Sequence, residues 1–181
     1  MILQYILLTS LLISPLDQDK LVRTKIDNGI SFGLPSNMHA MTDVEIASKY
    51  VSYRDALGFY TDEDRMADFI INHSATPWSP NDIEMLKDVY KSSIYNLYTE
   101  VDMIREEIRE VHGRKFIIYE FISSVSEENS MVQKADIVAY NFVGYTIVKN
   151  KVYVFTFSCP KRLQPKWQNT AQAMMDSIKI K

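Results

Sequence analysis

A chain of 181 residues is long enough for one domain with a hydrophobic core and too short for two ordinary domains. Apolar residues make up 46% of the chain and charged residues 24%, a composition that argues against extensive disorder. The net charge is −3 and Lys and Arg form no stripe, which disfavours binding to nucleic acids or to anionic membranes.

The N-terminus differs from the rest of the chain. Residues 2–13 are apolar apart from Gln4, Thr9 and Ser10, and this run is too short to span a bilayer, which takes about 20 residues. It has the length of the apolar region of a secretory signal, so we predict a signal peptide over residues 1–16 and a single domain over residues 17–181. No Lys or Arg precedes the run and no small-x-small cleavage site precedes Pro15, so a buried first strand or helix is the alternative.

Strands and helices alternate in the first half of the chain. Residues 26–34 predict a strand with a turn or bulge at Asn28-Gly29, and the capping-box pattern Thr42-x-x-Glu45 predicts a short helix over residues 43–50. Residues 53–59 are irregular or weakly extended, and residues 65–73 predict a second strand.

A long helix is predicted after a loop over residues 74–80. Ser79 can cap its start, and Pro80 and Asp82 suit its first turn. Its apolar face is marked by residues that recur at helical spacing: Ile83, Leu86, Tyr90, Ile94 and Leu97.

The second half of the chain predicts hairpins followed by one helix. Residues 101–111 and 114–125 form a hairpin around His112-Gly113, and a two-residue turn places Glu110 opposite Lys115 and Arg105 opposite Glu120, both pairs of opposite charge. A polar loop over 126–134, a strand over 135–148, a turn at 149–151 and a strand over 152–158 follow. The last helix presents Trp167, Ala171, Met174 and Ile178, a face that we expect to dock on the sheet.

Strands joined by hairpins, with helices before and after them, predict an α+β fold. We expect an α/β/α sandwich with a mainly antiparallel sheet and helices on both faces. When helices cover both faces of a sheet, side chains on both faces are apolar. This explains why apolar and polar residues do not alternate strictly at Ile117-Ile118 and in the run Val152-x-Val154-Phe155.

A resemblance to a known group supports this architecture. Its carriers are Ile30-Ser-Phe-Gly-Leu-Pro35, the helix from Pro80, the meander, and Trp167-x-x-x-Ala171-x-x-Met174. Together they resemble the PsbP-like superfamily, which groups the PsbP subunit of photosystem II, the yeast Ran-binding protein Mog and bacterial DcrB-like envelope proteins. The resemblance covers residues 27–179 and implies accessory, binding or chaperone roles without catalysis.

The sequence presents no catalytic, cofactor-binding or metal-binding constellation, so we do not expect an enzyme. His39, His73 and His112 lie in separate elements, and no two have the i, i+4 spacing of a helical zinc site. Cys159 follows an apolar strand and predicts a buried, inert thiol. Neither a Gly-x-Ser-x-Gly elbow nor a glycine-rich phosphate loop is present.

Two acidic groups have structural explanations. Glu106 and Glu107 are consecutive strand residues and therefore point to opposite faces, so they cannot serve one site. The run Asp62-Glu63-Asp64 precedes a strand and predicts a solvated turn.

Three residues are candidates for binding a partner. Trp78 lies in the loop before the long helix, where it either packs on the helix start or stands exposed as an anchor for a partner. His73 ends the preceding strand. Tyr60 lies in the other irregular segment, and its position beside Trp78 is a conjecture.

We therefore predict a non-catalytic accessory protein, secreted or periplasmic, that binds another protein or an envelope component. The first alternative is a cytosolic chaperone or adaptor for apolar partner segments, which requires that residues 1–13 are not a signal. The second is a small-molecule-binding protein or weak enzyme with a pocket near His73. The partner and the oligomeric state are left open.

Overall fold

A computed structural model describes residues 20–26, 29–50, 56–126 and 136–181. The predicted signal peptide over 1–16 and nearly all of the predicted polar loop over 126–134 lie outside these residues. The elements in chain order are β1 (Leu21–Ile26), β2 (Ile30–Pro35), β3 (Met38–Ala40), α1 (Asp43–Lys49), β4 (Gly58–Asp62), β5 (Asp68–His73), η2 (Pro80–Asp82), α2 (Ile83–Leu97), β6 (Glu100–Val111), β7 (Arg114–Val125), β8 (Ile137–Val148), β9 (Lys151–Pro160), η3 (Lys161–Leu163), α3 (Gln164–Asp176) and β10 (Lys179–Ile180).

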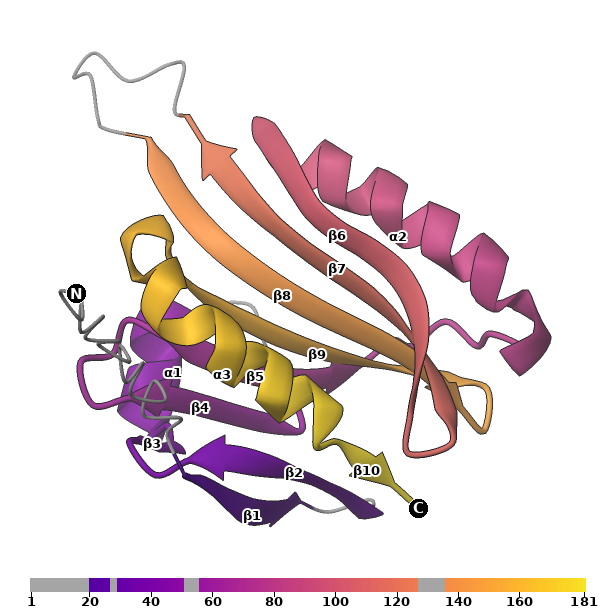
Figure 1. The fold of residues 1–181 in the computed structure, drawn as a ribbon, viewed down its shortest axis with the longest axis horizontal. Helices are drawn as coiled ribbons and strands as arrows, with labels where there is room; N and C mark the ends of the chain where they lie inside the picture. The colour runs from indigo at the N-terminus through magenta and orange to yellow at the C-terminus, as the bar shows by residue number, and fades with distance from the viewer. Residues whose placement is uncertain (1–19, 27–28, 51–55, 127–135) are drawn as a thin grey trace, which may run out of the picture.

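The strands form two antiparallel sheets. Seven strands are ordered β3-β4-β5-β9-β8-β7-β6, and a smaller sheet is ordered β1-β2-β10 (Figure 1). The strand predicted over residues 26–34, with a turn or bulge at Asn28-Gly29, is divided between two strands: β1 ends at Ile26, β2 begins at Ile30, and the two pair antiparallel with these residues opposite each other. Residues 53–59 are predicted to be irregular or weakly extended, and within the described residues the regular strand β4 begins at Gly58.

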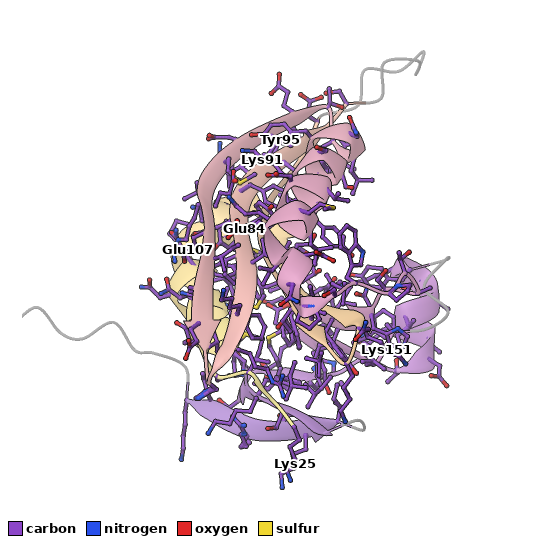
Figure 2. The ribbon with its side chains drawn as sticks, turned by 90° about the vertical axis from the view of Figure 1, so that its right-hand side faces the viewer. Lys25, Glu84, Lys91, Tyr95, Glu107 and Lys151 are labelled. Carbon is purple, nitrogen blue, oxygen red and sulfur yellow. The ribbon has the colours of Figure 1, made fainter. Side chains whose placement is uncertain are left out.

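Helices cover both faces of the larger sheet, which confirms the predicted α+β sandwich. α2 lies on one face, where Leu86 packs with Ile117 and Tyr145. α3 lies on the opposite face, where Trp167 and Met174 belong to a second cluster that also contains residues of β2 (Figures 1 and 2). Neighbouring residues of β7 therefore enter different clusters: Ile117 faces α2 and Ile118 faces α3.

Short sequence patterns predicted where the helices begin. Thr42 and Glu45 form the predicted capping box at the start of α1, with the Glu45 carboxylate accepting the Thr42 backbone N–H at 2.9 Å. Ser79 caps the short η2 turn that leads into α2. One residue of the predicted apolar face is wrong, because Leu97 at the end of α2 is 71% exposed.

The long β6–β7 hairpin has the predicted register. Glu110 is opposite Lys115 and Arg105 is opposite Glu120, around a turn in which His112 has a φ of 48° and Gly113 a φ of 78°. An extra residue, Ile104, then shifts the register by one between Met103 and Arg105. The bulge reverses the alternation of side chains along β6. Residues with even numbers face one surface of the sheet before the bulge and the other surface after it.

The face predicted for the last helix is confirmed. Trp167, Ala171, Met174 and Ile178 are all buried, and the Trp167 ring lies 5.5 Å from that of Phe157 on β9. The backbone then pairs Ile180 of β10 with Ile30 of β2, so the end of the chain joins the smaller sheet to α3.

Replacing Trp167 with Ala should lower the free energy of unfolding by about 3–5 kcal/mol, because a fully buried ring is removed and a cavity is left. Leu97→Ala, at the exposed end of α2, is the control and should change it by less than about 0.5 kcal/mol. Urea unfolding followed by far-UV circular dichroism measures both. Equal effects would contradict the assignment of Trp167 to the core.

Candidate functional site

The three predicted partner residues do not form one site. Trp78 is partly buried against the cluster beneath α2, and its backbone N–H donates to the carbonyl of Asn150 at 3.0 Å. Tyr60 is only 7% exposed and stacks edge-on against Phe32 in the cluster on the α3 side. Since the two clusters lie on opposite faces of the sheet, Tyr60 cannot flank Trp78.

His73 lies at the end of β5, where its ring meets the ring of Tyr153 edge-on at 6.3 Å. Its Nδ1 is buried and has no hydrogen-bond partner within the described part of the chain. Because Tyr153 packs against the α3-side cluster, His73 belongs to that face and Trp78 to the other.

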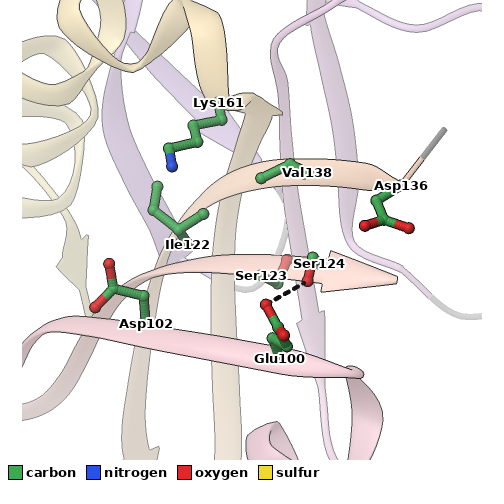
Figure 3. A pocket seen from close by; sticks show the side chains of 8 residues that line it. All are labelled: Glu100, Asp102, Ile122, Ser123, Ser124, Asp136, Val138 and Lys161. Atoms are coloured by element: carbon green, nitrogen blue, oxygen red, sulfur yellow. Dashed lines mark hydrogen bonds between the residues drawn. The ribbon is translucent and has the colours of Figure 1, made fainter. Parts of the chain in front are cut away.

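A cavity of about 320 Å³ opens at one end of the larger sheet. We call it the sheet-end cavity and define it by its lining residues: Glu100, Asp102, Ile122, Ser123, Ser124, Asp136, Val138 and Lys161. They come from the start of β6, the end of β7, the start of β8 and η3, which precedes α3 (Figure 3). The cavity thus lies where the strands extend beyond the beginning of α3 (Figure 1).

The antiparallel pairing explains how these residues meet. Glu100 is opposite Ser124, Ser124 is opposite Val138, and Asp102 is opposite Ile122, so their side chains share the α3-side face. Ile122 and Val138 are apolar and belong to or pack against the α3-side cluster, so they form the floor. Glu100, Asp102, Asp136 and Lys161 are exposed around it.

The carboxylates of the cavity make hydrogen bonds to hydroxyl groups. Ser124 Oγ donates to Glu100 at 3.5 Å, and Ser126 Oγ donates to Asp136 at 2.8 Å. Lys161 extends toward Ile122 without an ion pair to another described residue (Figure 3). The cavity therefore presents three negative charges and one positive charge over an apolar floor.

A buried carboxylate lies further along the same face. Glu120 is 0% exposed, and its Oε1 accepts hydrogen bonds from Tyr140 Oη at 3.0 Å and from Gln168 Nε2 at 2.5 Å. Arg105 Nε lies 3.2 Å from its other oxygen, and Arg105 also donates to Gln172 on α3. Burial, together with the Glu120 charge, raises the pKa of Tyr140. This network joins β6, β7, β8 and α3.

The other face has its own carboxylate anchor. Glu106 lies 2.8 Å from Lys87 Nζ and 2.6 Å from Lys91 Nζ, both on α2. Hydrogen bonds from these two lysines hold the pKa of Glu106 below its ordinary value of 4.5. Glu107 instead lies near Arg105 and Arg109, which confirms that consecutive glutamates point to opposite faces.

The acidic run before β5 is only partly solvated. Glu63 and Asp64 are exposed, as predicted, but Asp62 is 3% exposed and ends β4. Its Oδ1 accepts the backbone N–H groups of Met66 and Ala67 at 2.7 and 2.9 Å. The prediction was wrong for Asp62, because the turn itself needs a buried acceptor.

The remaining reactive groups are accounted for within the described residues. Cys159 is buried, and burial raises the pKa of its thiol to about 12, so it carries little thiolate near neutral pH. No group of three or more His, Cys, Asp or Glu residues in this part of the chain is arranged to hold a metal ion. Among the helices described, none has the length and apolarity needed to cross a membrane.

Comparisons with known proteins complete the description of the architecture. No family model matches the chain, and no curated protein matches it. Cyanobacterial PsbP (CyanoP) from Synechocystis is similar in structure, with 14% identity and a TM-score of 0.56 over 90% of this chain and 94% of that chain. The chain has the PsbP-like fold.

Two further structures share this PsbP-like fold. LpqN, involved in cell envelope biogenesis of Mycobacterium tuberculosis, is 9% identical with a TM-score of 0.56 over 83% of this chain and 82% of its own. The Ran-binding protein Mog1p of Saccharomyces cerevisiae is 9% identical with a TM-score of 0.56 over 88% of this chain and 96% of its own. The resemblance seen in the sequence is confirmed for the fold, and such identities carry no chemistry across.

Glu106→Gln should reduce the stability of the protein in a pH-dependent way. Because the pKa of Glu106 is lowered by folding, its contribution is complete above pH 4.5 and is lost as the pH falls through the folded pKa. We expect a loss of about 1 kcal/mol at pH 7 that shrinks below pH 4.5. Glu84→Gln, exposed on α2, is the control. Unfolding titrations from pH 3 to pH 7 measure the difference, and a pH-independent loss would contradict it.

Glu120→Gln should destabilise the protein by about 3 kcal/mol, because Arg105 loses the buried carboxylate that faces it. Glu107→Gln removes a partly exposed carboxylate 3.9 Å from the same arginine and should cost less than about 1 kcal/mol. Thermal unfolding compares the pair. Similar melting temperatures for the two variants would show that the buried network does not hold α3.

Proposed function

We propose that the protein is a non-catalytic accessory protein of the cell envelope or extracellular space, and that it binds a protein partner at the sheet-end cavity. The observation that carries this proposal is the cavity itself. Its volume of about 320 Å³ lies at the lower end of the range of ligand sites, and it opens on a part of the sheet that α3 leaves uncovered.

The character of the lining supports a binding role. Ile122 and Val138 offer an apolar floor, while Asp102, Asp136 and Lys161 surround it with charge. An apolar centre with a polar border is the usual composition of a protein interaction site. By contrast, the Cys159 thiol is buried and its raised pKa makes it a poor nucleophile.

The N-terminal apolar run and the structural likeness to LpqN support the compartment. LpqN is involved in cell envelope biogenesis, whereas Mog1p is a Ran-binding protein. N-terminal sequencing of the protein from its native host tests the compartment. A start near Asp17 to Lys20 supports it, and an intact Met1 would support the cytosolic chaperone or adaptor instead.

A photo-crosslinking amino acid at Val138, in the cavity floor, should capture one partner protein in intact cells. The same group at Val44, which is exposed on α1, is the control and should not capture it. Mass spectrometry of the crosslinked species reads the result.

A Trp78→Ala change in the Val138 background completes the test. Trp78 lies against the α2-side cluster and the cavity lies on the other face, so the crosslink should survive. Its loss would show that the loop over residues 74–80 contributes to binding the partner, as the sequence suggests for Trp78.

A further inference from the structure

The smaller sheet carries an excess of positive charge. Its described segments, residues 20–26, 29–35 and 177–181, contain five exposed cations and no Asp or Glu. The cations are Lys20, Arg23, Lys25, Lys179 and Lys181. No ion pair joins any of them to a carboxylate of the described residues. Because the whole chain has a net charge of −3, this excess is a property of one sheet.

Strand pairing brings three of these cations onto one face. Lys25 is opposite Ser31 and Ser31 is opposite Lys179, so the two lysines flank Ser31 on the same side of the sheet. Ser31 alternates with Ile30 and Phe32, which belong to the α3-side cluster, so this side faces away from the core. Figure 2 shows Lys25 extending away from the body of the molecule.

We call this side the basic face and define it by Arg23, Lys25 and Lys179, with Lys20 and Lys181 at its borders. Arg23 belongs to it because its partner Gly33 is two residues from Ser31 along β2. The sequence shows no stripe of Lys and Arg, since the two contributing segments lie at opposite ends of the chain. The fold therefore creates the basic face.

Arg23 is held on the basic face without being neutralised. One of its terminal nitrogens donates to the carbonyl of Ser177 at 2.8 Å, and the other donates to Ser31 Oγ at 2.5 Å. Both acceptors are neutral, whereas Arg109 meets the carboxylate of Asp176 at 2.6 Å. Neutral acceptors fix the position of the guanidinium and leave its positive charge for an anion outside the protein.

We propose that the basic face binds the surface of a bilayer that contains anionic phospholipids. Each Lys or Arg close to such a surface strengthens the attraction by about fivefold. Four of the five cations are Lys, whose hydrated charge on a flexible stem suits a diffuse negative surface. Recognition of particular carboxylates favours the planar fork of Arg, and Arg23 already uses both terminal nitrogens within the protein. The charges thus fit a lipid surface better than an acidic protein segment.

This inference goes beyond the proposed function and does not rest on it. The smaller sheet and the sheet-end cavity lie at opposite ends of the molecule (Figure 1). A bilayer at the basic face therefore leaves the cavity open to a partner on the side away from the lipid. In the sequence, residues 14–20 separate the apolar run from β1, and a linker of that length reaches at most about 25 Å. While that run is attached and inserted in a membrane, it keeps the basic face near the lipid surface.

Vesicle binding by the full chain tests the inference. The protein, purified from its native host, is mixed with phosphatidylcholine vesicles that contain one third phosphatidylglycerol or none, and flotation measures the bound fraction. It should bind the anionic vesicles at least about tenfold more strongly than the neutral ones. Added salt should weaken this binding, because exposed charges are screened.

Variants of the basic face locate the binding. Lys25→Gln should weaken binding to the anionic vesicles about fivefold, and the double variant with Lys179→Gln about 25-fold. Lys25→Arg keeps the charge and should keep the affinity. Lys161→Gln removes an exposed cation at the other end of the molecule and should change the affinity by less than about 1.5-fold. All three positions are exposed, so the variants should keep the wild-type melting temperature.

Three results would overturn the inference. Equal binding to both kinds of vesicle would mean that the apolar run over residues 2–13 brings the protein to lipid. Equal losses in Lys161→Gln and Lys25→Gln would mean that net charge decides and that no face is preferred. Absence of binding to the anionic vesicles would exclude a lipid surface. Shifts of the β1, β2 and β10 amide signals with a blocked hexapeptide of Glu would then assign the basic face to an acidic protein segment.

Discussion

Both faces of the seven-stranded sheet are apolar at its centre, and the remaining architecture follows from the need to cover them. Ile117 and Ile118 are adjacent in β7 and both are fully buried, one toward α2 and one toward α3. Burial of apolar surface contributes about 25 cal/mol per Å², so neither face can be left in water without a large loss of stability. One helix cannot cover both, which is why the chain places α2 before the meander and α3 after it.

Charged groups position these helices at the borders of the apolar clusters. Glu106 holds α2 through two lysines, and Glu120 holds α3 through Gln168 and through the arginine that it shares with Gln172. Apolar packing has little directional preference, whereas these contacts require particular side-chain geometry. The position of α3 matters for the proposed binding site, because its start at Gln164 determines how much of β6, β7 and β8 stays uncovered.

The sequence predicted those parts of the fold in which the information is local. The capping box at Thr42, the hairpin at His112-Gly113 and the buried spacing from Trp167 each specify structure within a few residues. The errors fall where pairing decides the outcome. Residues 21–26 mix three apolar with three polar residues without a strand-like alternation, and they form β1 because β2 offers them an edge.

The candidate site was the least predictable part. Trp78 is a candidate from the sequence because of its residue type. Its packing, however, depends on the cluster beneath α2, which is assembled from distant strands. Glu100 and Asp102 carried a usable signal, since they alternate with Val101 and Met103 and so mark a polar stripe on one face of β6. No pattern shows that α3 begins too late to cover that stripe, because helix docking is a tertiary property.

The bulge at Ile104 has a consequence for how the molecule behaves among its own copies. β6 is one edge of the larger sheet, and an edge of 12 residues invites another strand to extend it. The extra residue bends this edge, and the charged residues Arg105, Glu106, Glu107 and Arg109 leave Ile108 as the one apolar residue in the stretch from 105 to 110. A bulge and charged side chains are features by which an edge strand disfavours pairing with a strand of another copy.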